Sequence, residues 1–527
     1  MFQIRYVVFA LSLLGWSICL DEDFKFPDGF KIGAASSAYQ IEGAFNEDGK
    51  GESIWDRFVR QNPSPIKNNS TGDVAADSYH KYKEDVQLLK SVGFDHYRFS
   101  ISWTRIQPKG EINEINKKGI DYYNALIDEL LANKIEPLVT MTHFDLPQAL
   151  QDLGGWLNPE IVNYFEDYAY ILFTYFGDRV KYWITINEGL IMLLGYNLKV
   201  IAPGLHINGS GEYLAAHNII RAHAKAYRLY QREFKEKQNG QVGFLVVGKY
   251  MMPFDDSEES KRATERAFQF TIGWFAHPIF SEEGNYPQIM REVIERNSIA
   301  EKRRRSRLPS FTPEEINEIK GSADFFGLNH YSTYLVKAKH NFTGGKAMPP
   351  ITDRDFMVEL SCDPSWNSSG GNKNFCIFPT GLRGILNFIK NNYNNPPVFI
   401  TENGYGDSGR KDDQDRINYH QDYMTELLKS IHIDKCNVFG YTVWSLLDSF
   451  EWNSGYSLKF GLIHVDYEDR DRKRSLKQSA RYFQDVLKER ILPKSAHIKC
   501  KTFRKAFITY TKIPLRKTML KIQLYLI

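Results

Sequence analysis

Short apolar runs recur eight times along this chain, and segments with helical periodicity separate them. The runs span residues 30–35, 96–102, 136–142, 182–186, 242–247, 325–329, 398–401 and 438–444. Between them, residues 121–133 and 164–176 repeat apolar side chains with the 3.6-residue period of a helix, and Thr312 before Pro313 is a typical helix start. Eight alternations of strand and helix predict a single α/β domain, a (β/α)8 TIM barrel.

Two of the apolar runs lead directly into a glutamate. The fourth run continues into Asn187 and Glu188, and the seventh ends at Thr401 and continues into Glu402 and Asn403. The active site of a parallel barrel lies at the carboxyl ends of its strands, so both carboxylates are candidate catalytic groups. Two carboxylates are the minimum for cleaving a glycosidic bond. Taken singly, either glutamate could equally be a helix cap or a solvated side chain.

Polar and aromatic residues also lie in or after the other strands. They include Gln40, Arg98, His143, Tyr331, Trp444, Glu451 and Trp452. Amides and carboxylates can bind neighbouring sugar hydroxyls, and flat rings can cover the apolar face of a sugar. Each of these residues could alone belong to the core, but their agreement at successive strand ends predicts a sugar-binding site.

The two ends of the chain differ from the part between them. Residues 6–20 form an apolar run that is too short to span a bilayer comfortably, and Asp21 follows it, so we interpret residues 1–20 as a cleaved secretory signal. A retained anchor is the alternative. Residues 21–492 form the expected barrel domain, with no linker inside it. Residues 493–527 are a basic extension, draped on the surface or available to a membrane surface or a partner.

Sequons and cysteines agree with an extracellular location. The candidate glycosylation sites are Asn69, which overlaps a sequon at Asn68, together with Asn208, Asn341 and Asn367. Cys362 and Cys376 flank a loop rich in Gly, Ser and Asn, and are the best disulfide candidates, with two free thiols as the alternative.

Composition and motifs argue against several other functions. The net charge is +3, which gives no reason to expect a nucleic acid partner. Gly404, Gly406 and Gly409 match G-x-G-x-x-G, but a polar loop follows instead of the apolar helix that a dinucleotide site needs. No C-x-x-C, H-E-x-x-H or Walker motif occurs, so neither a metal nor a cofactor is expected, and no later apolar run is long enough to span a membrane.

Taken together, these motifs resemble glycoside hydrolase family 1, the retaining β-glucosidases, and are similar in style to its animal members. The matching stretches are residues 30–44, 49–58, 97–103, 154–156, 187–188, 308–312, 401–404 and 444–462. The resemblance implies that Glu188 is the general acid/base and Glu402 the nucleophile, with Arg98 and Tyr331 supporting Glu402. It further implies that the sugar is bound by Gln40, His143, Asn187, Tyr331, Trp444, Glu451 and Trp452.

The resemblance predicts a secreted enzyme that hydrolyses terminal β-D-glucosides, galactosides or fucosides by double displacement. The expected partner is a small-molecule β-glycoside, with a homodimer left open as the assembly. A thioglucosidase (myrosinase) acting on glucosinolates and a catalytically silent glycan-binding protein are the alternatives. Plant thioglucosidases of the family carry Gln at the acid/base position, so Glu188 favours O-glycosides. Gly189 departs from the usual proline and leaves the placement of Glu188 open.

Overall fold

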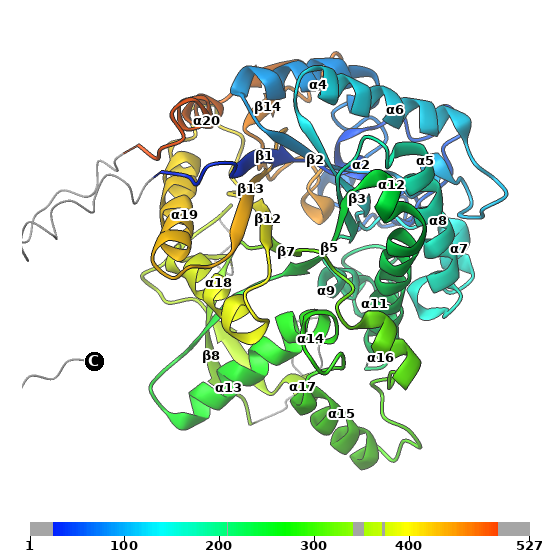
Figure 1. Ribbon diagram of the computed structural model, residues 1–527, viewed down its shortest axis with the longest axis vertical. Coiled ribbons are helices and arrows are strands. Elements are labelled where there is room, and N and C mark those ends of the chain that lie inside the picture. The colour runs from blue at the N-terminus through cyan, green and yellow to red at the C-terminus, as the bar shows by residue number, and fades with distance from the viewer. Residues whose placement is uncertain (1–24, 208, 341–352, 371–374, 494–527) are drawn as a thin grey trace, which may run out of the picture.

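A closed parallel β-barrel forms the centre of the computed structural model, which describes residues 25–207, 209–340, 353–370 and 375–493 (Figure 1). Around the ring the strands follow the order β1, β13, β12, β7, β5, β4, β3 and β2. Their bounds are β1 Lys31–Ala35, β2 His96–Ser100, β3 Glu136–Thr142, β4 Tyr182–Ile186, β5 Gln241–Val247, β7 Phe326–Asn329, β12 Val398–Asn403 and β13 Val438–Trp444. All eight predicted runs are barrel strands, and the predicted TIM barrel is confirmed.

Helices surround the barrel on its outer side (Figure 1). Their bounds are α2 Ala38–Ile41, α3 Ile54–Val59, α4 Ser78–Val92, α5 Trp103–Ile106, α6 Lys117–Ala132, α7 Gln148–Asp152, α8 Ile161–Phe176, α9 Gly189–Met192, α10 Leu194–Asn197, α11 Gly211–Leu229, α12 Lys235–Gln238, α13 Glu258–Phe268, α14 Trp274–Phe280, α15 Gln288–Ala300, α16 Pro313–Ile319, α17 Asp353–Phe356, α18 Thr380–Asn392, α19 Gln414–His432 and α20 Gln478–Glu489. The predicted start at Thr312 is a capping box, in which the Thr312 hydroxyl accepts from the Glu315 N–H while the Glu315 carboxylate accepts from the Thr312 N–H.

Short strands also form in the loops outside the barrel. They are β6 Tyr250–Pro253, β8 Thr333–Ala338, β9 Val358–Ser361, β10 Asn367–Ser368, β11 Cys376–Ile377, β14 Ile463–Val465 and β15 Arg474–Leu476. β6, β8 and β9 form one small sheet, in which β8 continues the chain beyond barrel strand β7. No helix in the described parts of the chain is long and apolar enough to cross a membrane.

The barrel interior is filled by a cluster of aromatic and aliphatic side chains. Leu138, Ile184, Leu245, Phe325 and Phe399 form this cluster, which is separate from the larger core under the helices. The ring of Phe399 on β12 lies 6.2 Å from that of Tyr182 on β4, although these strands are not neighbours. The cluster therefore closes the barrel, and the carboxyl ends of the strands above it remain available for a site.

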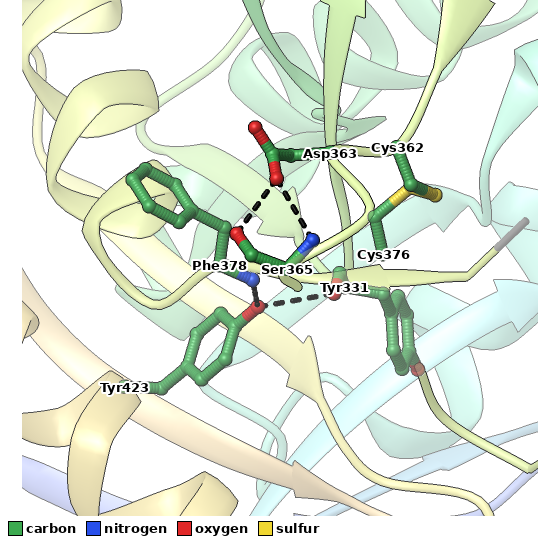
Figure 2. The surroundings of a disulfide bond; sticks show 7 residues. All are labelled: Tyr331, Cys362, Asp363, Ser365, Cys376, Phe378 and Tyr423. Carbon is green, nitrogen blue, oxygen red and sulfur yellow. Dashed lines mark hydrogen bonds between the residues drawn. A yellow bond between two sulfur atoms is a disulfide. The ribbon is translucent and has the colours of Figure 1, made fainter. Parts of the chain in front are cut away.

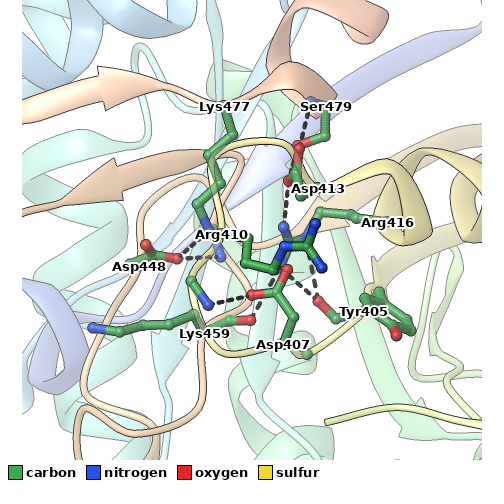
Figure 3. A network of polar contacts seen from close by, with 12 residues as sticks. Tyr405, Asp407, Arg410, Asp413, Arg416, Asp448, Lys459, Lys477 and Ser479 are labelled. Atoms are coloured by element: carbon green, nitrogen blue, oxygen red, sulfur yellow. Dashed lines mark hydrogen bonds and ion pairs between the residues drawn. The ribbon is translucent and has the colours of Figure 1, made fainter.

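The glycine-rich segment after β12 packs against the neighbouring strand. A Cβ at Gly404 would lie 1.9 Å from the carbonyl oxygen of Trp444, so only glycine allows the ends of β12 and β13 to approach so closely. A polar loop follows as predicted, and α19 begins only at Gln414. Arg416 of α19 holds this loop in place (Figure 3). Its guanidinium forms ion pairs with Asp407 and Asp413 and donates to the carbonyl oxygen of Tyr405.

Candidate active site

A pocket with about 260 Å³ of free volume opens at the carboxyl ends of the barrel strands. Eight residues singled out from the sequence line it: His143, Asn187, Glu188, Tyr331, Glu402, Trp444, Glu451 and Trp452. Gln40 and Arg98 are buried behind this lining and bond to members of it. Residues from seven different barrel strands and their following loops thus meet at one place, as expected for catalytic groups on this fold.

Glu402 is held by two donors, one on each carboxylate oxygen. The Arg98 guanidinium donates from Nη1 to Oε1, and the Tyr331 hydroxyl donates to Oε2 at 2.7 Å. Arg98 is only 1% exposed, and burial of a charged pair strengthens both the attraction and the cost of breaking it. Both contacts stabilise the ionised carboxylate and fix its orientation, as a nucleophile requires.

Arg98 connects Glu402 to the other glutamate. Its Nη2 donates to Oδ1 of Asn187 at 2.7 Å. Asn329, at the end of β7, then donates from Nδ2 to Oε1 of Glu188 at 2.8 Å. Asn329 also lies 3.4 Å from the Asn187 oxygen, so one chain of polar contacts joins the two carboxyl groups. This chain fixes their relative position without pairing them directly.

Glu188 has a strained backbone and a buried carboxyl group. Its φ is +41°, a left-handed conformation that is rare outside glycine and that is often found at functional sites. Burial, and secondly the negative charge of Glu402, raise the pKa of Glu188 to about 8, although Asn329, Arg98 and Lys249 oppose the shift. The carboxyl group is therefore protonated near neutral pH, while Glu402 has two donors for its charge. The two groups thus have the opposite environments that separate an acid from a nucleophile.

The neighbour of Glu188 explains one departure of the sequence from the family pattern. A Cβ at Gly189 would lie 2.6 Å from the ring of Phe275, which is fully packed in the core. Any larger residue at this position, proline included, would collide with that ring. Gly189 and Phe275 are therefore a matched pair, and Gly189 still begins helix α9 directly after Glu188.

Gln40 and Glu451 meet at the far side of the pocket. Nε2 of Gln40 donates to the carbonyl oxygen of Phe450 at 2.8 Å and to Oε2 of Glu451 at 3.2 Å. Burial, followed by the charges of Glu402 and Glu188, raises the pKa of Glu451 to about 8, and the Gln40 contact opposes this. A carboxyl group and an amide are thus placed side by side, which suits two neighbouring hydroxyls.

Three flat rings form one wall of the pocket. His143 stacks on Trp444 with 5.6 Å between ring centroids and on Trp452 with 5.9 Å. Burial, and then the charge of Arg98, lower the pKa of His143 well below its usual value, so its ring is neutral and Nε2 can accept from the Asn187 amide at 3.1 Å. Trp452 packs in turn on Trp55 at 4.6 Å. These rings provide an apolar surface for the face of a sugar.

A buried ion pair supports the loop that follows Trp444 and carries Trp452. Nζ of Lys477 lies 2.7 Å from the carboxylate of Asp448, and both side chains are fully buried (Figure 3). The Asp448 carboxylate also accepts from the backbone N–H of Gly461. Asp448 therefore joins the loop after β13 to β14 and to the start of α20, which keeps Glu451 and Trp452 in position.

Several pocket residues were not among the candidates from the sequence. Lys249, Tyr334 and Phe375 also line the pocket, and Asn329 contacts Glu188 from behind it. Lys249 lies two residues after β5, so the rule that found the other strand-end groups could have found it. Phe375 comes from a distant loop and packs on Tyr331 at 5.7 Å between ring centroids, a contact with no signal in the sequence.

The loop that carries Phe375 is closed by a disulfide. Cys362 and Cys376, the candidate pair from the sequence, are joined, with 5.6 Å between their Cα atoms. Figure 2 shows the disulfide close to Tyr331, whose backbone carbonyl accepts from the Tyr423 hydroxyl at 3.3 Å. The cross-link therefore restrains the wall of the pocket next to the residue that supports Glu402.

The sequons that the structure describes lie on the surface. Asn69 and Asn367 are exposed, and both are open to a glycan. Asn208 and Asn341 lie outside the described residues, as do the expected signal of residues 1–20 and most of the basic extension. In the described part of the chain, no group of three His, Cys, Asp or Glu side chains is arranged to hold a metal ion.

Comparisons with known proteins agree with this geometry. The sequence profile described as "Glycosyl hydrolase family 1" matches residues 22–491. The chain is 49% identical to Myrosinase 1 of Brevicoryne brassicae, with 88% of this chain and 99% of that protein aligned. It is 44% identical to the human cytosolic beta-glucosidase, over 88% and 98% of the two chains. The solved structure of an aphid myrosinase superposes with a TM-score of 0.84 at 48% identity, covering 88% of this chain and 99% of that one.

Proposed function

Because this chain belongs to glycosyl hydrolase family 1 and is an O-glycosyl hydrolase, we propose that it cleaves terminal β-D-glucosides with net retention of configuration. Glu402 is the nucleophile and Glu188 the general acid/base in this proposal. The observation that carries it is the contrast between two carboxyl groups in one pocket. Arg98 and Tyr331 donate to Glu402, whereas burial and the charge of Glu402 raise the pKa of Glu188 to about 8.

The first step forms a covalent glucosyl-enzyme. The Glu402 carboxylate attacks the anomeric carbon, while the protonated Glu188 gives its proton to the departing oxygen. The new ester removes the negative charge of Glu402. Since that charge is the second largest cause of the raised pKa of Glu188, the pKa then falls. Glu188 can now act as a base and activate the water that releases glucose.

Binding of the glucose ring is assigned to the residues on the other side of the pocket. Gln40 and Glu451 bond the hydroxyls far from the scissile bond, and Trp444 supports the apolar face of the ring. His143, Asn187 and Trp452 complete this subsite. Because the charge of Glu402 lies close enough to the sugar subsite to raise the pKa of Glu451, we expect neutral sugars in place of phosphorylated or acidic ones.

The anomeric form of the first product tests this proposal. Purified protein is mixed with 4-nitrophenyl β-D-glucoside, and the released sugar is followed by proton NMR before mutarotation. We expect β-glucose to appear first, and hydrolysis to be lost in the Glu402→Gln variant. Initial release of α-glucose, or unimpaired hydrolysis by that variant, would disprove the double displacement through Glu402.

A thioglucosidase is the second candidate, and the 49% identity to Myrosinase 1 favours it. Glu188 at the acid/base position favours O-glycosides, because its carboxyl group can protonate a poor leaving group, whereas a thiolate leaving group needs little protonation. Matched 4-nitrophenyl O- and S-β-glucosides separate the two candidates. A higher kcat/KM on the O-glucoside than on the S-glucoside is the result expected here, and the reverse order would favour the thioglucosidase.

We also propose that the enzyme is secreted and glycosylated. Three independent features support this: the short apolar run of residues 6–20, exposed sequons at Asn69 and Asn367, and the disulfide between Cys362 and Cys376. Expression of the full chain in animal cells provides the test. We expect the protein in the medium, starting near residue 21, with a mass that falls after enzymatic deglycosylation. Retention inside the cells with residues 1–20 intact would disprove secretion.

A further inference from the structure

Lys249 is a cation in the active-site pocket to which the catalytic scheme gives no role. It follows β5 by two residues, lines the pocket and is partly exposed there. Its ammonium group lies 5.8 Å from the ring centroid of Tyr334. Among the described residues, Lys249 makes no hydrogen bond and no ion pair, unlike Arg98, the other cation of the site. An unpaired ammonium in a pocket is costly unless a ligand pairs with it.

The order of strands places Lys249 opposite the sugar-binding residues. Glu402 lies on β12 and Glu188 follows β4, and these strands divide the barrel into two arcs. One arc, β13, β1, β2 and β3, is followed by the groups assigned to the glucose ring, Gln40, His143 and Glu451. The other arc, β7 and β5, is followed by Tyr331, which donates to Glu402 itself, and by Tyr334 and Lys249. A glycosidic bond between the two glutamates therefore has its sugar on the first arc and its leaving group on the second.

The electrostatics of the pocket make this arrangement selective. Glu402 is the negative charge on the sugar side, and it raises the pKa values of both Glu451 and Glu188, whereas Glu188 is the carboxyl group that acts on Lys249. Burial lowers the pKa of Lys249 to about 8, with Glu188 opposing the shift, so the amine is charged at pH 6. At that pH Glu188 is itself protonated and cannot pair with it. The positive charge on the leaving-group side thus remains open to a ligand.

We infer that Lys249 is a specificity-determining residue that binds an acidic group, a carboxylate or a sulfate, on the leaving group of the substrate. This inference rests on the proposed function, since it needs a glycoside between Glu188 and Glu402. Tyr334 forms the apolar floor beneath the ammonium, and the ring of an aromatic leaving group can pack beside it. The sugar stays neutral, and the acidic group of the substrate lies on the other side of the scissile bond.

Two aryl glucosides of equal shape test the inference. They are 4-carboxyphenyl and 4-carbamoylphenyl β-D-glucoside, and the readout is the ratio of their kcat/KM values at pH 6. We expect the acidic compound to lose about tenfold relative to the neutral one in Lys249→Met, and Lys249→Arg to keep most of the ratio. Lys337→Met is the matched control, because Lys337 also lies near an aromatic ring, 5.5 Å from Phe254, but is exposed outside the pocket.

The outcomes separate this inference from the proposed function. Hydrolysis of the neutral compound by the wild type tests only the glucosidase. An unchanged ratio in Lys249→Met, including an equal loss on both compounds, would overturn the role of Lys249 while leaving the glucosidase intact. The dissociation constants of both compounds are a second readout that needs no turnover. A tighter wild-type binding of the acidic compound that Lys249→Met abolishes supports the inference even where turnover is absent.

Discussion

Replacing Glu188 by Gln should stabilise the folded protein, and the gain should grow with pH. Glu188 is 9% exposed, and the pKa of its carboxyl group is raised from 4.5 to about 8 by burial and by Glu402. An acid with a higher pKa in the folded state binds more protons there than in the unfolded chain. The stability of the wild type therefore falls as the pH rises from about 4.5 to about 8, whereas glutamine does not titrate.

The size of the effect follows from the shift. Each pH unit in this window changes the contribution of one such group by up to about 1.4 kcal/mol. The titration of Glu188 is coupled to that of the neighbouring carboxyl groups. We therefore expect the free energy of unfolding of the wild type to fall, relative to that of Glu188→Gln, by about 2–4 kcal/mol between pH 5 and pH 8. The entropy of unfolding of a chain of 527 residues is about 1 kcal/mol per kelvin. The Tm advantage of Glu188→Gln should then widen by about 2–4 °C over this range.

Differential scanning fluorimetry at a fixed scan rate can measure this. The wild type and Glu188→Gln are compared at pH 5, 6, 7 and 8 at constant ionic strength. Glu236→Gln is the control, because Glu236 is exposed on α12 and its replacement should give a difference that does not change with pH. A Tm difference for Glu188→Gln that stays constant or shrinks toward pH 8 would refute the assignment of a raised pKa to Glu188.

Three further predictions address Glu402, its donor Tyr331, and Glu451. Glu402→Gly should lose hydrolysis and, with added azide, give the α-glucosyl azide, since azide enters from the face that Glu402 leaves; recovery of the β-azide would contradict the assignment. Tyr331→Phe removes the 2.7 Å bond to Glu402 and should lower kcat/KM about 10- to 100-fold, measured on an aryl glucoside. Glu451→Gln should lower kcat/KM on β-glucosides about 10- to 1000-fold and change the ratio of glucosidase to fucosidase activity, and a flat ratio would remove Glu451 from the sugar subsite.

The barrel could be predicted from the sequence because each strand is a local pattern. Short apolar runs gave all eight strands, and the errors lie at their ends. The second strand ends at Ser100 instead of Ser102, and the seventh continues to Asn403, so Glu402 lies inside β12. Strand hydrogen bonds between neighbours decide these boundaries, and the sequence of one strand does not contain them.

Much of the candidate site could be predicted from the sequence for a similar reason, but the rest of it could not. Strand ends meet at one edge of a parallel barrel, so residues such as Gln40 and Glu451, far apart in sequence, could be expected together. The contact of Gly189 with Phe275 depends on how a helix packs behind the site. The position of Phe375 depends on the loop that the Cys362–Cys376 disulfide closes. Such contacts are specific to the folded chain and follow from no local pattern.

The charge of Glu402 links the chemistry to the binding of the sugar. It raises the pKa of Glu451 as well as that of Glu188, and in both cases it is the second cause after burial. In the proposed mechanism this charge disappears as the bond to the anomeric carbon forms. Glu451 then ionises more readily, and an ionised carboxylate accepts hydrogen bonds from hydroxyls more strongly than a neutral acid. The contact of Glu451 with the sugar would therefore strengthen as the reaction proceeds, which lowers the barrier and not only the KM.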